Sequence, residues 1–78
     1  FTTMDRVYVL TELQKVDNTL KNTVIGVYND LLDACNEMNN QYMLYNGVIK
    51  CTQLLQRAIK FEEDGNIILL KVESFEIK

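Results

Sequence analysis

The chain has 78 residues, the size of one small domain, and its eight basic and eleven acidic residues give a formal charge of −3. The basic residues are scattered along the chain, so no basic stripe is present and we expect no nucleic-acid partner. The chain has no histidine and a single serine, Ser74. This composition removes the commonest general base and argues against a serine hydrolase.

Cysteine use and hydropathy indicate an intracellular, cytoplasmic protein. Cys35 and Cys51 do not form a C-x-x-C pair, and a small secreted domain usually carries more cysteines. No apolar run approaches the roughly 18 residues of a membrane span, and no basic-then-apolar leader opens the sequence, so we expect no membrane partner. Phe1-Thr2-Thr3 precede Met4, and this position favours Met4 as the natural first residue.

An antiparallel hairpin is expected at the start of the chain. Arg6–Gln14 and Thr23–Tyr28 are rich in Val, Ile, Tyr and Thr, which suit strands. The connector between them, Lys15–Asn22, is short and polar, which favours direct pairing of the two strands. Gly26 indicates either a bulge or the close approach of another backbone.

Three stretches are apolar on both faces of a strand: Val7–Leu13, Thr23–Tyr28 and Ile67–Val72. Because successive side chains of a strand point to opposite faces, such stretches normally belong to a sheet that is covered on both sides. The expected helical residues provide one layer only. We therefore expect a second covering layer, for example a second copy of the chain.

A helix is expected over Asn29–Tyr45, where apolar residues recur with helical period. Asn29 is a suitable N-cap, and Asp30 and Asp33 place negative charge in the first turn, where the helix dipole favours it. Asn46-Gly47 is a typical helix end.

After this helix, the spacing of apolar residues from Val48 favours a second short helix to about Gln56. A strand from about Arg57 to Glu62 follows, because Asp64-Gly65-Asn66 predicts a hairpin turn before the last strand. A bulge near Glu73-Ser74 would move the end of the last strand to its other face.

The expected fold is therefore α+β, one domain over residues 1–78. It contains a mostly antiparallel sheet of two hairpins with one main helix, in the order ββα(α)ββ.

No residue set predicts a reaction, a cofactor or a metal, and we expect no enzyme. Asp30, Asp33 and Glu37 share a helical face and could present oxygens to Mg²⁺ or Ca²⁺, but a solvated acidic face is the simpler interpretation. Two separated cysteines without histidine make a poor zinc site. The chain also lacks the glycine-rich motifs that bind nucleotide phosphates.

Tyrosine and aliphatic side chains on the strands are the candidate binding surface, because interfaces favour residues with a large apolar body and a polar tip. Membership of the protein's own core is about equally favoured for these residues. The candidate interface residues are Tyr8, Leu10, Val24, Tyr28, Ile67 and Leu69.

The sequence Val7-Tyr8-Val9-Leu10-Thr11-Glu12, followed by Ile25-Gly26-Val27-Tyr28 and by Asp33-Ala34, resembles small uncharacterised proteins of bacteriophages, bacteria and large DNA viruses. In those proteins a similar strand, strand and helix follow one another. The resemblance covers about Val7 to Ala34 and implies no activity.

We therefore expect a non-enzymatic protein-protein interaction module. We expect it to form a homodimer through the second face of the sheet or through a sheet edge, and the resemblance adds the modulation of a host or phage protein by direct binding. One alternative is an inhibitor that mimics nucleic acid through Glu62, Glu63 and Asp64. The other is a small metal-dependent enzyme built on Asp30, Asp33 and Glu37.

Overall fold

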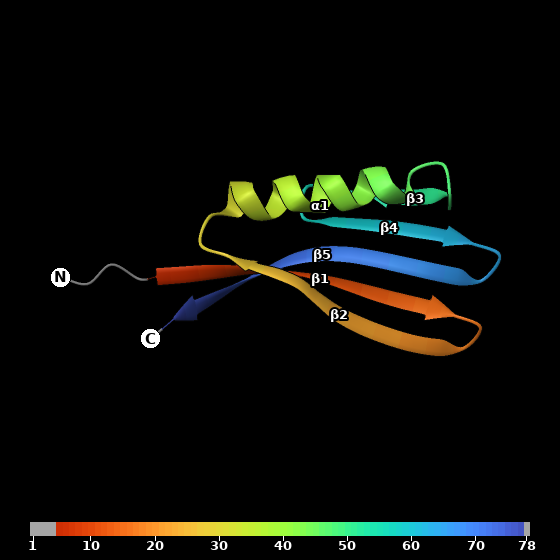
Figure 1. Ribbon diagram of the computed structural model, residues 1–78, viewed down its shortest axis with the longest axis horizontal. Coiled ribbons are helices and arrows are strands. Elements are labelled where there is room, and N and C mark those ends of the chain that lie inside the picture. Colours follow the sequence, from red (N-terminus) through yellow and green to blue (C-terminus); the bar gives the residue numbers. More distant parts are fainter. Residues whose placement is uncertain (1–4, 78) are drawn as a thin grey trace.

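A computed structural model describes residues 5–77, so the natural start expected at Met4 lies outside the described residues. The elements are β1 (Asp5–Val16), β2 (Thr19–Tyr28), α1 (Leu31–Tyr45), β3 (Cys51–Leu54), β4 (Ala58–Glu63) and β5 (Asn66–Ile77). The strands form one antiparallel sheet in the order β2-β1-β5-β4-β3 (Figure 1). The expected small α+β fold is confirmed.

The expected second short helix is wrong, because Cys51–Leu54 forms strand β3 instead. β3 pairs with the outer edge of β4, where Leu54 lies opposite Ile59. An isolated helix of this length is marginal in water, whereas pairing satisfies main-chain groups of β4 that would otherwise lack partners. The strand expected from about Arg57 is present as β4.

The β1–β2 and β4–β5 hairpins each turn within two residues that have left-handed backbone conformations. Asp17 and Asn18 have φ of 51° and 66°, and Asp64 and Gly65 have φ of 54° and 82°. Two successive residues with positive φ match the right-handed twist of paired strands. The Asp-Gly signal is therefore confirmed, whereas most of the expected connector Lys15–Asn22 belongs to the strands themselves.

β1 and β5 form the centre of the sheet. Their register runs without a shift from Asp5 opposite Ile77 to Lys15 opposite Ile67. No bulge therefore interrupts β5 near Glu73-Ser74, and the side chains of this strand alternate regularly to its end. Each strand has 12 residues, which at about 3.3 Å per residue gives a length of roughly 40 Å.

The bulge expected near Gly26 is confirmed in β2. Gly26 lies opposite Leu10 and Val24 lies opposite Thr11, which leaves Ile25 as the extra residue. The ring of Tyr28 lies against Gly26, since a Cβ atom added at this glycine would be 2.7 Å from the Tyr28 Cζ atom. A side chain, not a second backbone, makes the close approach.

Replacing Gly26 with alanine is expected to lower the free energy of unfolding by about 1–3 kcal/mol, because the new methyl group overlaps the Tyr28 ring. Urea denaturation followed by circular dichroism measures the loss. In a Tyr28→Leu background the same alanine should cost clearly less, which separates the collision from general effects of a residue in a bulge. Equal costs in the two backgrounds would contradict this explanation.

α1 begins one residue later than the sequence suggests. Asp30, not Asn29, is the N-cap, and its Oδ1 atom accepts a hydrogen bond of 2.9 Å from the Leu32 amide. The helix ends at Tyr45 as expected, where the Asn46 amide donates to the Tyr42 carbonyl at 2.8 Å.

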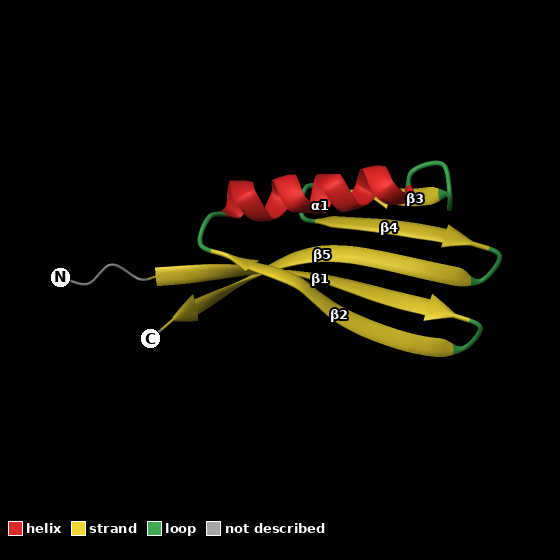
Figure 2. Cartoon of the chain, viewed as in Figure 1, coloured by secondary structure: helices red, strands yellow, loops and turns green. Residues whose placement is uncertain are grey.

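The core lies between α1 and one face of the sheet, which we call the helix face. Every buried residue of the strands points to this face by its pairing. α1 contributes Ala34 and Met38, and the strands contribute Leu10, Ile59, Phe61, Ile68, Leu70 and Val72. Within residues 5–77, α1 is the one element outside the sheet (Figure 2), so the opposite face receives no covering layer.

Candidate functional site

The opposite face of the sheet, which we call the open face, is largely apolar. Strand pairing places side chains of β1, β2 and β5 together on it, and none of them is buried. Its large apolar residues are Val7, Val9, Leu13, Leu20, Val24, Val27, Ile67, Leu69, Phe75 and Ile77.

The open face is large enough to be an interface. Leu20, Val24 and Val27 of the edge strand expose 67%, 61% and 60% of their surface. Most apolar side chains that β1 and β5 place on this face are half-buried, and only neighbouring side chains of the same sheet cover them. Four strands about 4.8 Å apart and about ten residues long cover roughly 600 Å². A typical stable interface takes about 800 Å² from each partner, and exposed apolar patches above a few hundred Å² mark interaction sites.

Charges of both signs are balanced on the open face. The Lys60 Nζ atom lies 3.5 Å from the Glu62 Oε1 atom, and the Lys71 Nζ atom lies 3.4 Å from the Glu73 Oε1 atom. These exposed pairs contribute little to stability. Their consequence is a nearly neutral patch on an acidic protein, which a second copy can approach without strong repulsion.

Three of the candidate interface residues, Val24, Ile67 and Leu69, lie on the open face. Leu10 is fully buried in the core, so its assignment to an exposed surface is wrong. Tyr8 and Tyr28 are paired as expected, but on the helix face, where both pack against the core. The six residues therefore do not form one surface.

The Ile25 bulge explains this separation. In a regular strand Val24 and Tyr28 would share a face, whereas the extra residue turns Val24 to the open face beside Val27. Sequence reasoning also missed Leu20, which it placed in the connector, and Phe75. An unbroken alternation through β5 would have identified Phe75.

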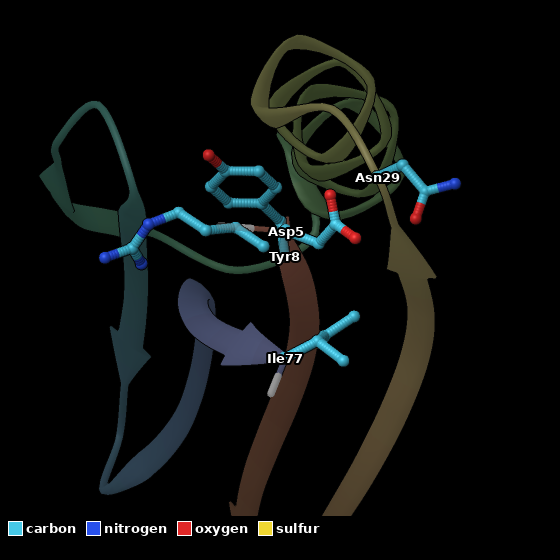
Figure 3. Close-up of a pocket in the computed structure, with 5 residues that line it drawn as sticks. Asp5, Tyr8, Asn29 and Ile77 are labelled. Atoms are coloured by element: carbon cyan, nitrogen blue, oxygen red, sulfur yellow. The ribbon is translucent and has the colours of Figure 1, made fainter. Parts of the chain in front are cut away.

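Tyr8 lines a shallow pocket of about 560 Å³ together with Asp5, Arg6, Asn29 and Ile77. Figure 3 shows the ring of Tyr8 on the same side of the strands as α1, with its hydroxyl directed away from the helix, whereas the side chain of Asn29 points away from that ring. The guanidinium of Arg6 already has partners: Nη1 donates to the Ser74 hydroxyl at 2.7 Å, and Nη2 lies 3.7 Å from a Glu76 carboxylate oxygen. In this pocket Arg6 is thus engaged by its neighbours, and the side chains of Tyr8 and Asn29 point in different directions.

A buried carboxylate, Glu12, lies on the helix face, and sequence reasoning did not identify it. The Tyr45 hydroxyl donates to the Glu12 Oε2 atom at 2.6 Å, and the Gln14 amide donates to the same oxygen and to the Tyr45 hydroxyl. Burial, followed by the hydrogen bond to Glu12, raises the pKa of Tyr45 above its ordinary value. The cluster joins the last turn of α1 to β1, which is a structural role.

Tyr45→Phe is expected to cost about 1–2 kcal/mol at neutral pH, because Glu12 loses a hydrogen-bond donor. The raised pKa of Tyr45 means that its contribution is full below about pH 10 and is lost as pH rises through the folded-state pKa. The difference in stability between the wild type and the variant should therefore shrink above pH 10. Urea midpoints measured from pH 8 to pH 11 check this, and a constant difference would contradict it.

The acidic residues of α1 do not form a metal site. Asp30 is engaged as the N-cap, and the Glu37 carboxylate accepts from the side-chain amides of Asn40 and Gln41. Among residues 5–77, no group of three or more His, Cys, Asp or Glu side chains is arranged to hold a metal ion. The geometry thus gives no support to the metal-dependent alternative.

The acids proposed to mimic nucleic acid are also divided. Glu62 points to the open face, where it pairs with Lys60. Glu63 ends β4, and Asp64 lies in the following turn. The three carboxylates thus do not make one negative surface.

Comparison with models of known protein families, with curated proteins and with solved structures finds no match. In the part of the chain that the structure describes, no helix is long and apolar enough to cross a membrane.

Proposed function

We propose that this chain is a non-enzymatic protein-protein interaction module that forms a homodimer through its open face. The observation that carries the proposal is the open face itself, on which ten large apolar side chains receive no covering layer from the described residues. A domain of 78 residues has little stability in reserve, so burying this face would add stability by mass action.

A face-to-face dimer would have four layers, with two sheets at the centre and one α1 on each outer side. Packed sheets lie about 10 Å apart and interdigitate their side chains. Each sheet would then be covered on both faces, which is the arrangement that strands apolar on both faces normally adopt. Dimerisation thus accounts for the sequence pattern as well as for the exposed surface.

A twofold dimer uses the same patch on both copies, so the patch must be complementary to itself. The open face meets this requirement because lysine and glutamate occur together on it. A rotation about a twofold axis can bring Lys71 or Lys60 of one copy near Glu73 or Glu62 of the other.

The resemblance of Val7–Ala34 to small phage and viral proteins supports a role in which the dimer binds and modulates a host or phage protein. Both cysteines are free, which fits a reducing intracellular compartment.

Sedimentation velocity from low micromolar to submillimolar protein tests the dimer. The expected result is a concentration-dependent shift from about 9 to about 18 kDa. A chain that stays strictly monomeric over this range would contradict the proposal.

A further inference from the structure

A second apolar surface lies on the helix side of the molecule, between α1 and the loop that joins β3 to β4. It is a groove of about 590 Å³ lined by Leu31, Leu32, Cys35 and Asn39 of α1 and by Leu54 and Leu55. Leu32, Leu54 and Leu55 each expose more than half of their surface. Figure 1 shows β3 running beside α1.

The groove exists because one helix is narrower than the sheet. A helix is about 10–12 Å across, whereas five strands about 4.8 Å apart span roughly 20–24 Å. α1 packs mainly on β1, β2 and β5. Leu54 of β3 points to the helix face, since it pairs with the buried Ile59, yet α1 does not cover it. The groove is therefore the unfilled part of the helix layer.

The flank of α1 beside the groove carries no charge. At 100° per residue, the flank that includes Leu32 and Asn39 continues through Asn36 and Met43. The carboxylates of Asp33 and Glu37 fall on the opposite flank. A charged side chain of a binding partner would lose its hydration in the groove without gaining an oppositely charged neighbour. The groove therefore favours a partner whose contacting surface is uncharged and apolar.

We propose that this groove binds the apolar face of an amphipathic helix of a partner protein, laid alongside α1 over β3 and the loop that follows it. The lining residues of α1 extend from Leu31 to Asn39, a rise of roughly 12 Å, which matches about two helical turns with apolar anchors at i, i+4 and i+7. The groove and the open face lie on opposite sides of the sheet, so a dimer would present two grooves on its outer surfaces.

The test uses two synthetic peptides of equal composition, each locked as a helix by a hydrocarbon staple because short free helices are marginal. One carries leucines at i, i+4 and i+7, and the other has the same leucines spread around the helix. Cys35 reports occupancy through its rate of alkylation by a maleimide in a Cys51→Ser variant. The expected result is that the first peptide slows alkylation about tenfold at nine-tenths saturation, whereas the second does not.

Matched variants locate the binding site. Leu54→Gln should weaken binding of the first peptide about tenfold or more, whereas Leu44→Gln, an exposed leucine on the opposite flank of α1, should leave it unchanged. Equal binding of the two peptides, alkylation that stays fast at saturation, or equal effects of the two variants would each overturn the proposal. Concentration-dependent protection of Cys35 without peptide would assign the groove to a second copy and would also overturn it.

These readouts are independent of the open face. A failure of the groove proposal leaves the sedimentation result unchanged, and a monomer in sedimentation leaves peptide binding intact.

Discussion

Leu69→Lys is expected to weaken self-association by about 100-fold or more, so that the variant sediments as a monomer where the wild type is a dimer. Leu69 lies on the central strand β5, opposite Leu13 on one side and Lys60 on the other, near the middle of the open face. In a face-to-face dimer the new ammonium group would be buried twice, once from each copy, and without a partner. The monomer should remain folded because the side chain points away from the core.

The matched control is Leu44→Lys, which makes the same chemical change on an exposed residue of α1. This variant should associate like the wild type. Circular dichroism of both variants confirms that the fold is retained. If Leu69→Lys still dimerises with unchanged affinity while folded, the open face is not the interface.

Residue pattern alone predicts four of the five strands and the uncovered face, but it does not predict which residues share that face. Alternation along β1 and β5 is regular, so Ile67 and Leu69 are placed together correctly. In β2 a single extra residue, Ile25, reverses the side to which Val24 points. A glycine indicates that a bulge is possible, but the position of the extra residue depends on how β1 and the Tyr28 ring pack around it.

β3 shows the second limit of local reasoning. The apolar spacing after Val48 fits a helix, but the unpaired edge of β4 stabilises a strand there instead. Similarly, nothing local indicates that Glu12 would meet Tyr45 from the end of α1, 33 residues away. Both features arise from contacts between distant segments, and a periodic pattern contains no information about them.

Phe61→Ala is expected to lower the free energy of unfolding by about 3–5 kcal/mol. The ring of Phe61 is fully buried between α1 and the sheet, with ring centroids 5.8 Å from Tyr42 and 5.6 Å from Tyr45. Its removal leaves a cavity and deprives two aromatic side chains of α1 of their contact. A domain of this length has a total stability of roughly 4–12 kcal/mol, so much of the variant should be unfolded at 37 °C.

Urea denaturation at one fixed protein concentration measures this loss, since dimerisation makes the midpoint depend on concentration. Leu55→Ala, which removes an exposed side chain, should change stability by less than about 0.5 kcal/mol. If the alanine variant does not fold, Phe61→Leu keeps the measurement possible, because it retains most of the apolar volume and should cost less. A loss below about 1 kcal/mol in Phe61→Ala would mean that α1 does not depend on this ring, and that some other contact holds the helix against the sheet.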